Sequence, residues 1–325
     1  MVKKFDVICI GAALVDMVSK VARHPSEDDE VFVSEMKILS GGAAANTAVA
    51  CSKLGLNTAF IGKLGLNDEF AKKIINDFKE ASVNINFLKY SEIYNTGSAY
   101  VALNSEGDRR IYAHSGAANY LSAQDIKEEE IKKTKIIYLS SLKNIVPFIE
   151  ASKICKKYNI PVILNPGMLI IEQGFEDIKS LLKLLDILIL SENEFKSLLS
   201  FPQEQSFSRQ SYEEGAQKLK ILGIKNIIIT LGEKGALLIS KDDSQLIETI
   251  KIDKVLDTTG AGDAFSAGFI YKFSNNPKIE FNNLINCVKI GNFIAANCIQ
   301  HLGARYGIPD LNKVKNFEKT LNNKI

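Results

Sequence analysis

The chain contains 325 residues, of which 46% are hydrophobic, and its 40 basic side chains nearly balance 38 acidic ones. This composition suffices for a large core in one α/β domain, and the small net charge argues against general binding to nucleic acid or anionic membranes. The cysteines form no C-x-x-C pair, and the histidines lack metal-ligand spacing. No uncharged apolar segment reaches the ~18 residues of a membrane helix. The scattered cysteines predict reduced core thiols in a cytoplasmic protein, and the balanced charge predicts a small-molecule partner.

The first predicted element is a buried strand. Phe5–Gly11 is a short apolar run that ends at a glycine, with Asp16 just beyond it. Residues 15–40 are more polar and alternate between polar and apolar side chains. This alternation predicts exposed antiparallel strands instead of further core.

Two glycines, Gly41 and Gly42, then open a predicted helix that extends to Leu54. Two interpretations follow from the residues alone. The glycines either form a turn with a closely packed helix behind it, or they let a ligand approach the backbone beside Asn46, whose amide offers both donors and an acceptor.

Residues 67–81 carry apolar side chains at helical spacing, with Asn67 as the expected cap. Beyond them, residues 97–103 and 109–113 alternate and are joined by a polar, glycine-containing turn, which predicts a hairpin. Ala99 and Tyr112 in this hairpin either face a ligand or belong to an ordinary hydrophobic surface.

From the capping box at residues 122–125 onward, predicted strands and helices alternate. This rhythm predicts parallel strands with crossover helices, and ligands of such sheets bind at the carboxyl ends of the strands. The predicted strands span 135–139, 161–165, 187–190 and 225–231, and a typical helix between them spans 145–158. The polar residues at the strand ends are Asn165, the Ser191-Glu192-Asn193-Glu194 group and Thr230-Leu231-Gly232.

Residues 257–269 begin with threonines and glycines and continue into a run of helix formers. The pattern predicts a tight turn that enters a helix N-terminus, where free amide groups and the helix dipole favour an anion. Asp263 lies at this point. It either caps the helix, or it acts as a general base beside an anion hole.

Residues 257–269 resemble the second signature of the ribokinase-like sugar kinases, the PfkB carbohydrate kinase family, and residues 41–62 are similar to its first signature. The resemblance covers nearly the whole chain. It implies an α/β fold with a doubly wound, mostly parallel central sheet flanked by helices. It also implies a single kinase domain over residues 1–325, with a small β-sheet lid formed by about 14–40 and 96–114.

The resemblance further implies roles for the residues around the acceptor. Asp263 is expected to be the catalytic base, and the backbone of Gly260, Ala261 and Gly262 to form the anion hole. The residues expected to hold the hydroxyl groups of the substrate are Asp16, Gly41, Gly42 and Asn46.

On the donor side, the resemblance implies ATP. Asn165 lies in an N-P motif near the transferring phosphate, and Thr230 and Gly232 lie in a T-x-G motif at the nucleotide phosphates. Asn292 and the segment 288–305 are expected to flank adenine.

The resemblance also implies two cations. Glu194 corresponds to the acid of an N-x-x-E motif that organises Mg²⁺ through water, although Ser191 replaces the motif's Asn. Without the resemblance, Glu194 would be a first-turn acid favoured by the helix dipole. K⁺ is expected near Asp257 and Thr259.

We therefore predict an ATP- and Mg²⁺-dependent kinase that phosphorylates a hydroxyl group, a primary CH₂OH, of a sugar. A nucleoside of the adenosine or cytidine type is the alternative acceptor. A sugar phosphate is a further possible acceptor, because Arg109 and Arg110 in the lid could bind its phosphate group. A homodimer through the lid strands is compatible with the alternation in residues 31–33. Two other classes are a non-catalytic ligand-binding homologue, which would not need Asp263, and a nicotinamide-dependent oxidoreductase, whose G-x-G-x-x-G is missing after the first strand.

Overall fold

The computed structural model describes residues 3–106, 108–204, 207–241 and 243–322. Within these ranges, the largest sheet has eight strands in the order β14-β13-β12-β11-β10-β9-β1-β4. The pairs from β12 to β4 are parallel, whereas β13 and β14 add an antiparallel edge. The strands are β1 (Phe5–Gly11), β4 (Thr58–Ile61), β9 (Thr134–Ser140), β10 (Val162–Asn165), β11 (Ile187–Ser191), β12 (Asn226–Thr230), β13 (Ala236–Ile239) and β14 (Ser244–Ile247).

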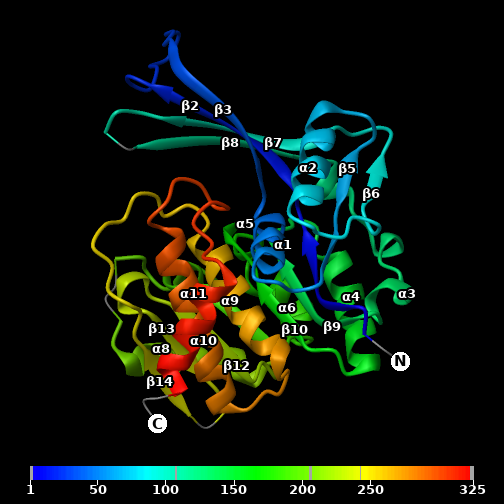
Figure 1. Ribbon diagram of the computed structural model, residues 1–325, viewed down its shortest axis with the longest axis vertical. Coiled ribbons are helices and arrows are strands. Elements are labelled where there is room, and N and C mark those ends of the chain that lie inside the picture. Colours follow the sequence, from blue (N-terminus) through cyan, green and yellow to red (C-terminus); the bar gives the residue numbers. More distant parts are fainter. Residues whose placement is uncertain (1–2, 107, 205–206, 242, 323–325) are drawn as a thin grey trace.

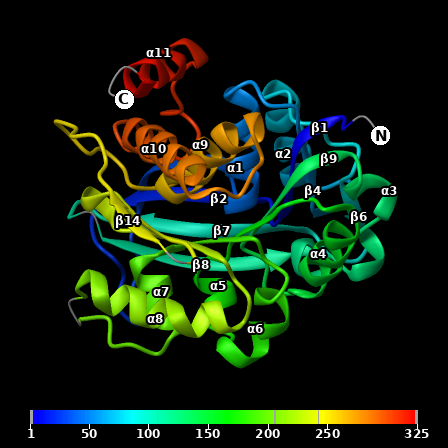
Figure 2. The same cartoon turned by 90° about the horizontal axis from the view of Figure 1, so that it is seen from below.

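Helices cover both faces of this sheet (Figure 2). Because successive side chains of a strand point to opposite faces, Val7 and Cys9 of β1 join one hydrophobic core, and Ile8 and Ile10 join the other. The helices that contribute side chains to the first core are α1 (Ala43–Lys53), α2 (Glu69–Glu80), α9 (Ala261–Asn275), α10 (Phe281–Cys298) and α11 (Leu311–Asn322). The second contains α4 (Val146–Tyr158), α5 (Met168–Ile171), α6 (Phe175–Leu182), α7 (Glu192–Leu198) and α8 (Arg209–Ile221). The predicted doubly wound arrangement is confirmed.

A second, small sheet lies across one end of the molecule, at the top of Figure 1. Its order is β3-β2-β7-β8, formed by β2 (Leu14–Val21), β3 (Val33–Gly41), β7 (Thr96–Leu103) and β8 (Arg109–Gly116). β2 pairs with β3, and β7 with β8, in antiparallel fashion, as the alternating patterns predicted. The two hairpins join through a parallel pairing of β2 with β7.

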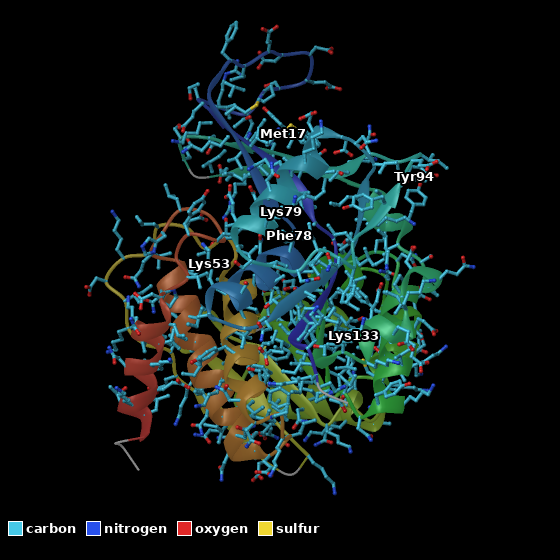
Figure 3. All side chains as sticks on the ribbon, turned by 45° about the vertical axis from the view of Figure 1, so that its right-hand side comes forward. Met17, Lys53, Phe78, Lys79, Tyr94 and Lys133 are labelled. Carbon is cyan, nitrogen blue, oxygen red and sulfur yellow. The ribbon has the colours of Figure 1, made fainter. Side chains whose placement is uncertain are left out.

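The register of the small sheet separates its two faces. Asp16, Leu39, Ala99 and Ala113 are aligned across the strands and share one face. Each neighbour in sequence points the opposite way, so Tyr112 lies on the face away from Asp16. Helix α2 packs beside β2, with Phe78 buried beneath the sheet that carries Met17 (Figure 3).

Two local details correct the sequence-based expectations. Helix α2 is capped by Asp68, which accepts from the amide of Ala71, whereas the expected cap Asn67 has a φ of 67° in the left-handed region. The β13–β14 hairpin was not predicted. Its edge strand β14 is short and half exposed, so it carries little of the apolar signal that marks a strand.

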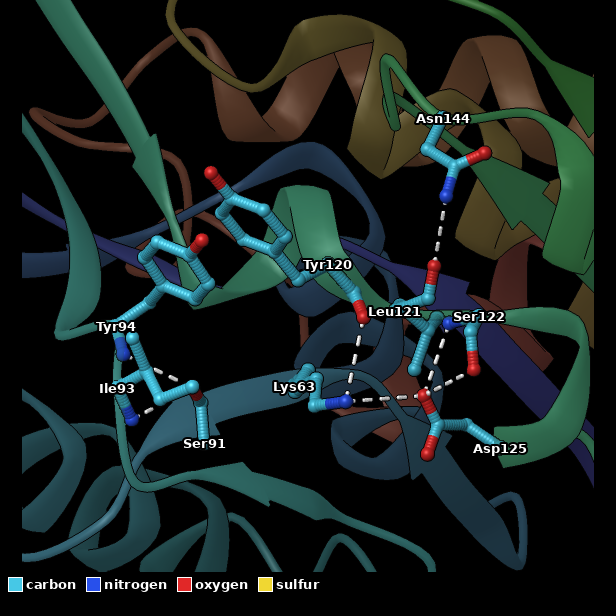
Figure 4. A network of polar contacts seen from close by, with 9 residues as sticks. All are labelled: Lys63, Ser91, Ile93, Tyr94, Tyr120, Leu121, Ser122, Asp125 and Asn144. Atoms are coloured by element: carbon cyan, nitrogen blue, oxygen red, sulfur yellow. Dashed lines mark hydrogen bonds and ion pairs between the residues drawn. The ribbon is translucent and has the colours of Figure 1, made fainter.

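A polar network joins the small segment after β4 to the turn that follows β8 (Figure 4). Lys63 in β5 (Lys63–Gly65) donates to the Tyr120 carbonyl at 3.2 Å and to Asp125 Oδ2 at 3.1 Å. The same carboxylate closes the predicted capping box with Ser122. The rings of Tyr94 and Tyr120 stack beside it, with centroids 3.5 Å apart. The network therefore ties β5 to the segment at residues 120–125, which leads from β8 toward β9.

No helix among the described residues has the length and apolar character needed to cross a bilayer.

Candidate active site

Asp263 faces the first glycine-opened helix instead of capping its own. Helix α9 begins at Ala261, and its N-cap Gly260 makes no side-chain cap bond. The Asp263 carboxylate accepts a hydrogen bond through Oδ2 from Asn46 Nδ2 of α1, at 2.9 Å. The capping interpretation of Asp263 is therefore wrong, and the two predicted signatures meet at this bond although 217 positions separate the residues.

The surroundings of Asp263 adjust its acidity. Burial raises its pKa to about 6, while the Asn46 amide and the Arg305 charge oppose the rise and the charges of Glu194 and Asp16 add to it. Burial likewise raises the pKa of Asp16 to about 6 against the opposing charge of Arg305. A carboxylate with such a pKa is ionised at neutral pH and accepts a proton more readily than an ordinary aspartate.

The two glycines around Ala261 meet different needs. Gly260 has a φ of 77°, and a β-carbon there would lie 2.3 Å from the β-carbon of Ala304. Close approach and backbone conformation both require this glycine. Gly262 has nothing within 4 Å of the corresponding position. The first turn of α9 therefore opens into free space next to Asp263.

The acceptor side is packed tightly around Asp16. A β-carbon on Gly41 would lie 2.1 Å from Asp16 Oδ2, and one on Gly42, whose φ is 93°, would lie 2.5 Å from the Ala12 carbonyl oxygen. Close packing therefore accounts for both glycines. This agrees with the interpretation in which they form a turn with a closely packed helix behind it. Asn46 is 8% exposed and follows them in the first turn of α1.

A cleft of about 1050 Å³ extends from the first turn of α9 to the carboxyl end of β12. Three residues predicted to bind the nucleotide, Thr230, Gly232 and Asn292, line it together with Ala261 and Gly262, which were predicted to form the anion hole. Its apolar wall consists of Leu246, Ile250, Ile252, Val255, Phe265, Ala295, Ala296 and Ile299.

The predicted donor-side residues contribute differently to this cleft. The buried Asn292 donates to the carbonyl oxygens of Ile247 and Glu248, at 2.9 and 3.3 Å, so its amide holds the wall in place. Asn165 is not among the lining residues and reaches Ser266 Oγ at 3.5 Å. Residues 302–305, expected to flank adenine, are also outside the lining.

Glu194 closes a capping box at the start of α7. Its Oε2 accepts from the Ser191 amide at 2.7 Å, and its own amide donates to Ser191 Oγ at 3.2 Å. Burial raises the pKa of Glu194 despite these bonds. Its charge also acts on Asp263. A half-buried carboxylate whose charge acts on Asp263 fits a Mg²⁺ ion held through water. Among the described residues, no cluster of three His, Cys, Asp or Glu side chains is arranged to hold a metal directly.

Asp257 organises the loop before α9. Its Oδ1 accepts from the Thr259 amide and its Oδ2 from the Gly303 amide, both at 2.9 Å. Although burial acts to raise the pKa of Asp257, these hydrogen bonds and the Arg109 charge lower it below the usual value. Arg109 of the small sheet also donates to Thr259 Oγ1 at 2.9 Å.

Sequence reasoning missed a buried polar layer beneath Asp263. Thr47 Oγ1 lies 3.4 Å from the Tyr138 hydroxyl and 3.4 Å from the Asp263 carbonyl oxygen. Burial and the Asp263 charge raise the pKa of Tyr138. Tyr138 lies within an apolar strand, so only its contacts reveal its place. Arg305 was expected only as part of the segment that flanks adenine, and its contact with Asn46 was missed.

Residues 4–311 match the model of a protein family described as "pfkB family carbohydrate kinase". The chain belongs to this family. A ribokinase of Staphylococcus aureus is 29% identical to it over 311 residues, which cover 95% of this chain and 98% of that protein.

Solved structures show the same relationship. The Arabidopsis thaliana ribokinase, described as a complex with ribose and ATP, has a TM-score of 0.85 and 27% identity, covering 98% of this kinase and 99% of that chain. A nucleoside kinase of Methanocaldococcus jannaschii has a TM-score of 0.76 and 25% identity, covering 98% of this kinase and 100% of that chain.

The family, the ribokinase-like fold and the enzyme class predicted from the sequence are confirmed. The protein is a phosphotransferase of the carbohydrate kinase type, which acts on a hydroxyl group. The nicotinamide-dependent alternative is wrong.

Proposed function

We propose that this kinase transfers the γ-phosphate of ATP to a hydroxyl group, a primary CH₂OH, of a sugar. One observation carries the proposal. The Asp263 carboxylate lies on the first turn of the helix whose residues Ala261 and Gly262 line the cleft of about 1050 Å³. This arrangement supports a proton acceptor next to an anion site, and the Asn46 amide binds the same carboxylate. The ribose and ATP of the Arabidopsis complex support the choice of both substrates.

In the proposed mechanism, Asp16 and Asn46 orient the acceptor beside Asp263. Asp263 takes the proton of the hydroxyl group as its oxygen attacks the γ-phosphorus. The new O–P bond forms, the bond from the γ-phosphorus to the bridging oxygen breaks, and ADP leaves with that oxygen. The amides at the start of α9 stabilise the charge on the transferring group.

Two cations complete the proposal. Glu194 would hold Mg²⁺ through water, and the bound ion would neutralise phosphate charge. K⁺ would bind near Asp257 and Thr259. Both oxygens of Asp257 already accept amide hydrogen bonds, so this residue would act chiefly by shaping the loop.

We propose that the whole chain is one kinase domain in which residues of about 14–40 and 96–114 act as a lid. The Asp16 face of this small sheet would cover the sugar and exclude water, which competes as an acceptor. The opposite face exposes Met36, Ile38 and Tyr112. This apolar face supports a homodimer through the lid strands, which light scattering on purified protein would test. The buried free cysteines support a cytoplasmic location.

The test is an ADP-release assay with Mg-ATP and a panel of ribose, deoxyribose, fructose, ketodeoxygluconate, adenosine and cytidine. We expect turnover with one sugar, and its loss in Asp263→Asn while ATP still binds. Turnover with a nucleoside and no sugar would reverse the substrate class, an outcome for which the M. jannaschii neighbour is a precedent. ATP binding without turnover on any acceptor would indicate a non-catalytic homologue, and equal turnover in both proteins would exclude Asp263 as the base.

A further inference from the structure

Arg305 extends into the acceptor side of the site from the loop after α10. Its Nε donates to Asn46 Oδ1 at 2.7 Å, and its Nη2 lies 3.5 Å from the Gly41 carbonyl oxygen. The loop that carries it is held from two sides. Lys53 Nζ, near the end of α1 (Figure 3), donates to the Arg305 carbonyl oxygen at 2.6 Å, and the Gly303 amide donates to Asp257.

The bond from Arg305 determines which way the Asn46 amide points. A guanidinium group only donates hydrogen bonds, so the amide oxygen of Asn46 must face it. The amide nitrogen then faces Asp263, where it donates to Oδ2 at 2.9 Å. The flipped amide would set its oxygen against the carboxylate and its NH₂ group against the cation, and both contacts would be repulsive.

Arg305 also balances negative charge at this point. Burial lowers its pKa, and the charges of Asp77 on α2, Asp263 on α9 and Asp16 on β2 act in the opposite direction. Asp263 itself is faced by Arg305, by Glu194 on α7 and by Asp16, with the neutral Tyr138 beneath it. Among these groups, Arg305 is the cation whose charge opposes the rise in pKa of both Asp16 and Asp263.

We propose that Arg305 is a positioning residue for phosphoryl transfer, which orients the Asn46 amide toward Asp263 through the hydrogen bond from its Nε. The proposal rests on the function proposed above. It assigns a role to a loop residue outside both signatures. It also implies that the guanidinium, whose Nε already donates to Asn46 Oδ1, acts on the acceptor through Asn46 and does not itself bind an acidic substituent of the acceptor.

The experiment compares Arg305→Met, Arg305→Lys, Asn46→Ala and the double variant Arg305→Met/Asn46→Ala with the wild-type enzyme. In Arg305→Met we expect kcat/KM for the sugar to fall about ten- to a hundredfold, because a hydrogen bond to a charged group is lost. The KM for ATP should stay within about twofold, since Arg305 is outside the donor cleft. The acidic limb of the pH–rate profile should move to higher pH, because Asp263 loses a neighbouring positive charge.

The double variant tests whether Arg305 acts through Asn46. At pH 8, where Asp263 is ionised in every variant, we expect it to be no slower than Asn46→Ala alone, because the same interaction has already been removed. Arg305→Lys keeps the charge but not the planar donor, so it should restore the pH profile more than the rate. If Arg305→Met does not fold, Arg305→Lys decides the matter, since wild-type sugar kinetics in that variant would contradict the proposal.

Three results would overturn the inference. A wild-type enzyme that turns over a sugar while Arg305→Met stays within about twofold, with an unmoved pH profile, would leave Arg305 a packing residue. Loss of turnover only with acidic acceptors would make it a substrate-binding group. A wild-type enzyme inactive on every acceptor would refute the proposed function, and the inference with it.

Discussion

Arg109 on strand β8 donates a hydrogen bond of 2.9 Å to the hydroxyl of Thr259, the residue directly before Gly260. The bond joins the small sheet to the loop that begins α9, across 150 positions of sequence. The amide of the same threonine donates to Asp257, which also accepts from Gly303. The Arg109 side chain therefore links the small sheet to the loop proposed to form the anion hole.

Replacement of Arg109 by alanine should weaken sugar binding. The bond is exposed, so its loss is worth about 0.5–1 kcal/mol, and the KM for the sugar should rise about two- to fivefold with a smaller change in kcat. Arg110→Ala is the matched control, because adjacent residues of a strand point to opposite faces. Steady-state kinetics on both variants check the prediction. Equal effects in the two variants would show that only the charge of the strand matters.

Asp263→Asn should raise the melting temperature at pH 8 while it removes activity. Burial raises the folded-state pKa of Asp263 from 3.8 to about 6, so the stability that this group contributes is present below pH 3.8 and is lost as the pH rises through 6. At pH 8 the ionised carboxylate is a cost, and its removal should add about 2 °C. The gain should shrink toward pH 5.

Asp257→Asn is the matched control for the same thermal scans. Although burial opposes it, hydrogen bonding lowers the pKa of Asp257, so its stability contribution is present at neutral pH and is lost on acidification. This variant should melt at a lower temperature than the wild type at pH 8. Shifts of the same sign in both variants would contradict the assigned directions.

Gly262→Ala should keep the fold and lose activity. The added methyl group meets no atom within 4 Å, and alanine favours a helix, so the melting temperature should not fall. The methyl group would, however, project into the space proposed for the transferring phosphate, and kcat should fall at least about tenfold. Gly260→Ala should instead lower the melting temperature, because its φ is 77° and Ala304 blocks the new atom. An active Gly262→Ala enzyme would move the anion hole elsewhere.

Glu194→Gln separates the proposed magnesium role from helix capping. Glutamine can replace glutamate in a capping box, so the melting temperature should stay within about 1 °C. The Mg²⁺ concentration for half-maximal rate should rise about tenfold, because the carboxylate charge is lost. Ser191→Ala, which breaks the same capping box, is the control and should lower stability instead. An unchanged Mg²⁺ dependence in Glu194→Gln would leave Glu194 a capping residue.

Much of the fold was predictable because its signals are local. The apolar run Phe5–Gly11 and the glycine-opened helices α1 and α9 each depend on neighbouring residues, and each forms where the pattern indicated. The cleft was predictable in part. Ligands of parallel sheets bind at the carboxyl ends of the strands, and Thr230 and Gly232 at the end of β12 line the cleft, whereas Asn165 and Glu194 do not.

Other features depend on contacts that no local pattern encodes. Alternation in β8 shows that Tyr112 and Ala113 point opposite ways, but only the pairing of β2, β7 and β8 decides that Tyr112 lies away from Asp16. The choice of Asp68 over Asn67 as a cap depends on which residue the chain holds in the left-handed region.

By itself, the sequence determined the family, the α/β fold and the motifs that contain Asn46 and Asp263, because those signals are short-range and repeat at known spacings. Only the tertiary structure decided that the Asn46 amide bonds the Asp263 carboxylate and that Arg305, 259 positions from Asn46, holds that amide in place. The physical reason is that a hydrogen bond depends on the distance and direction between two groups, and the packing of α1, α9 and the loop after α10 sets both.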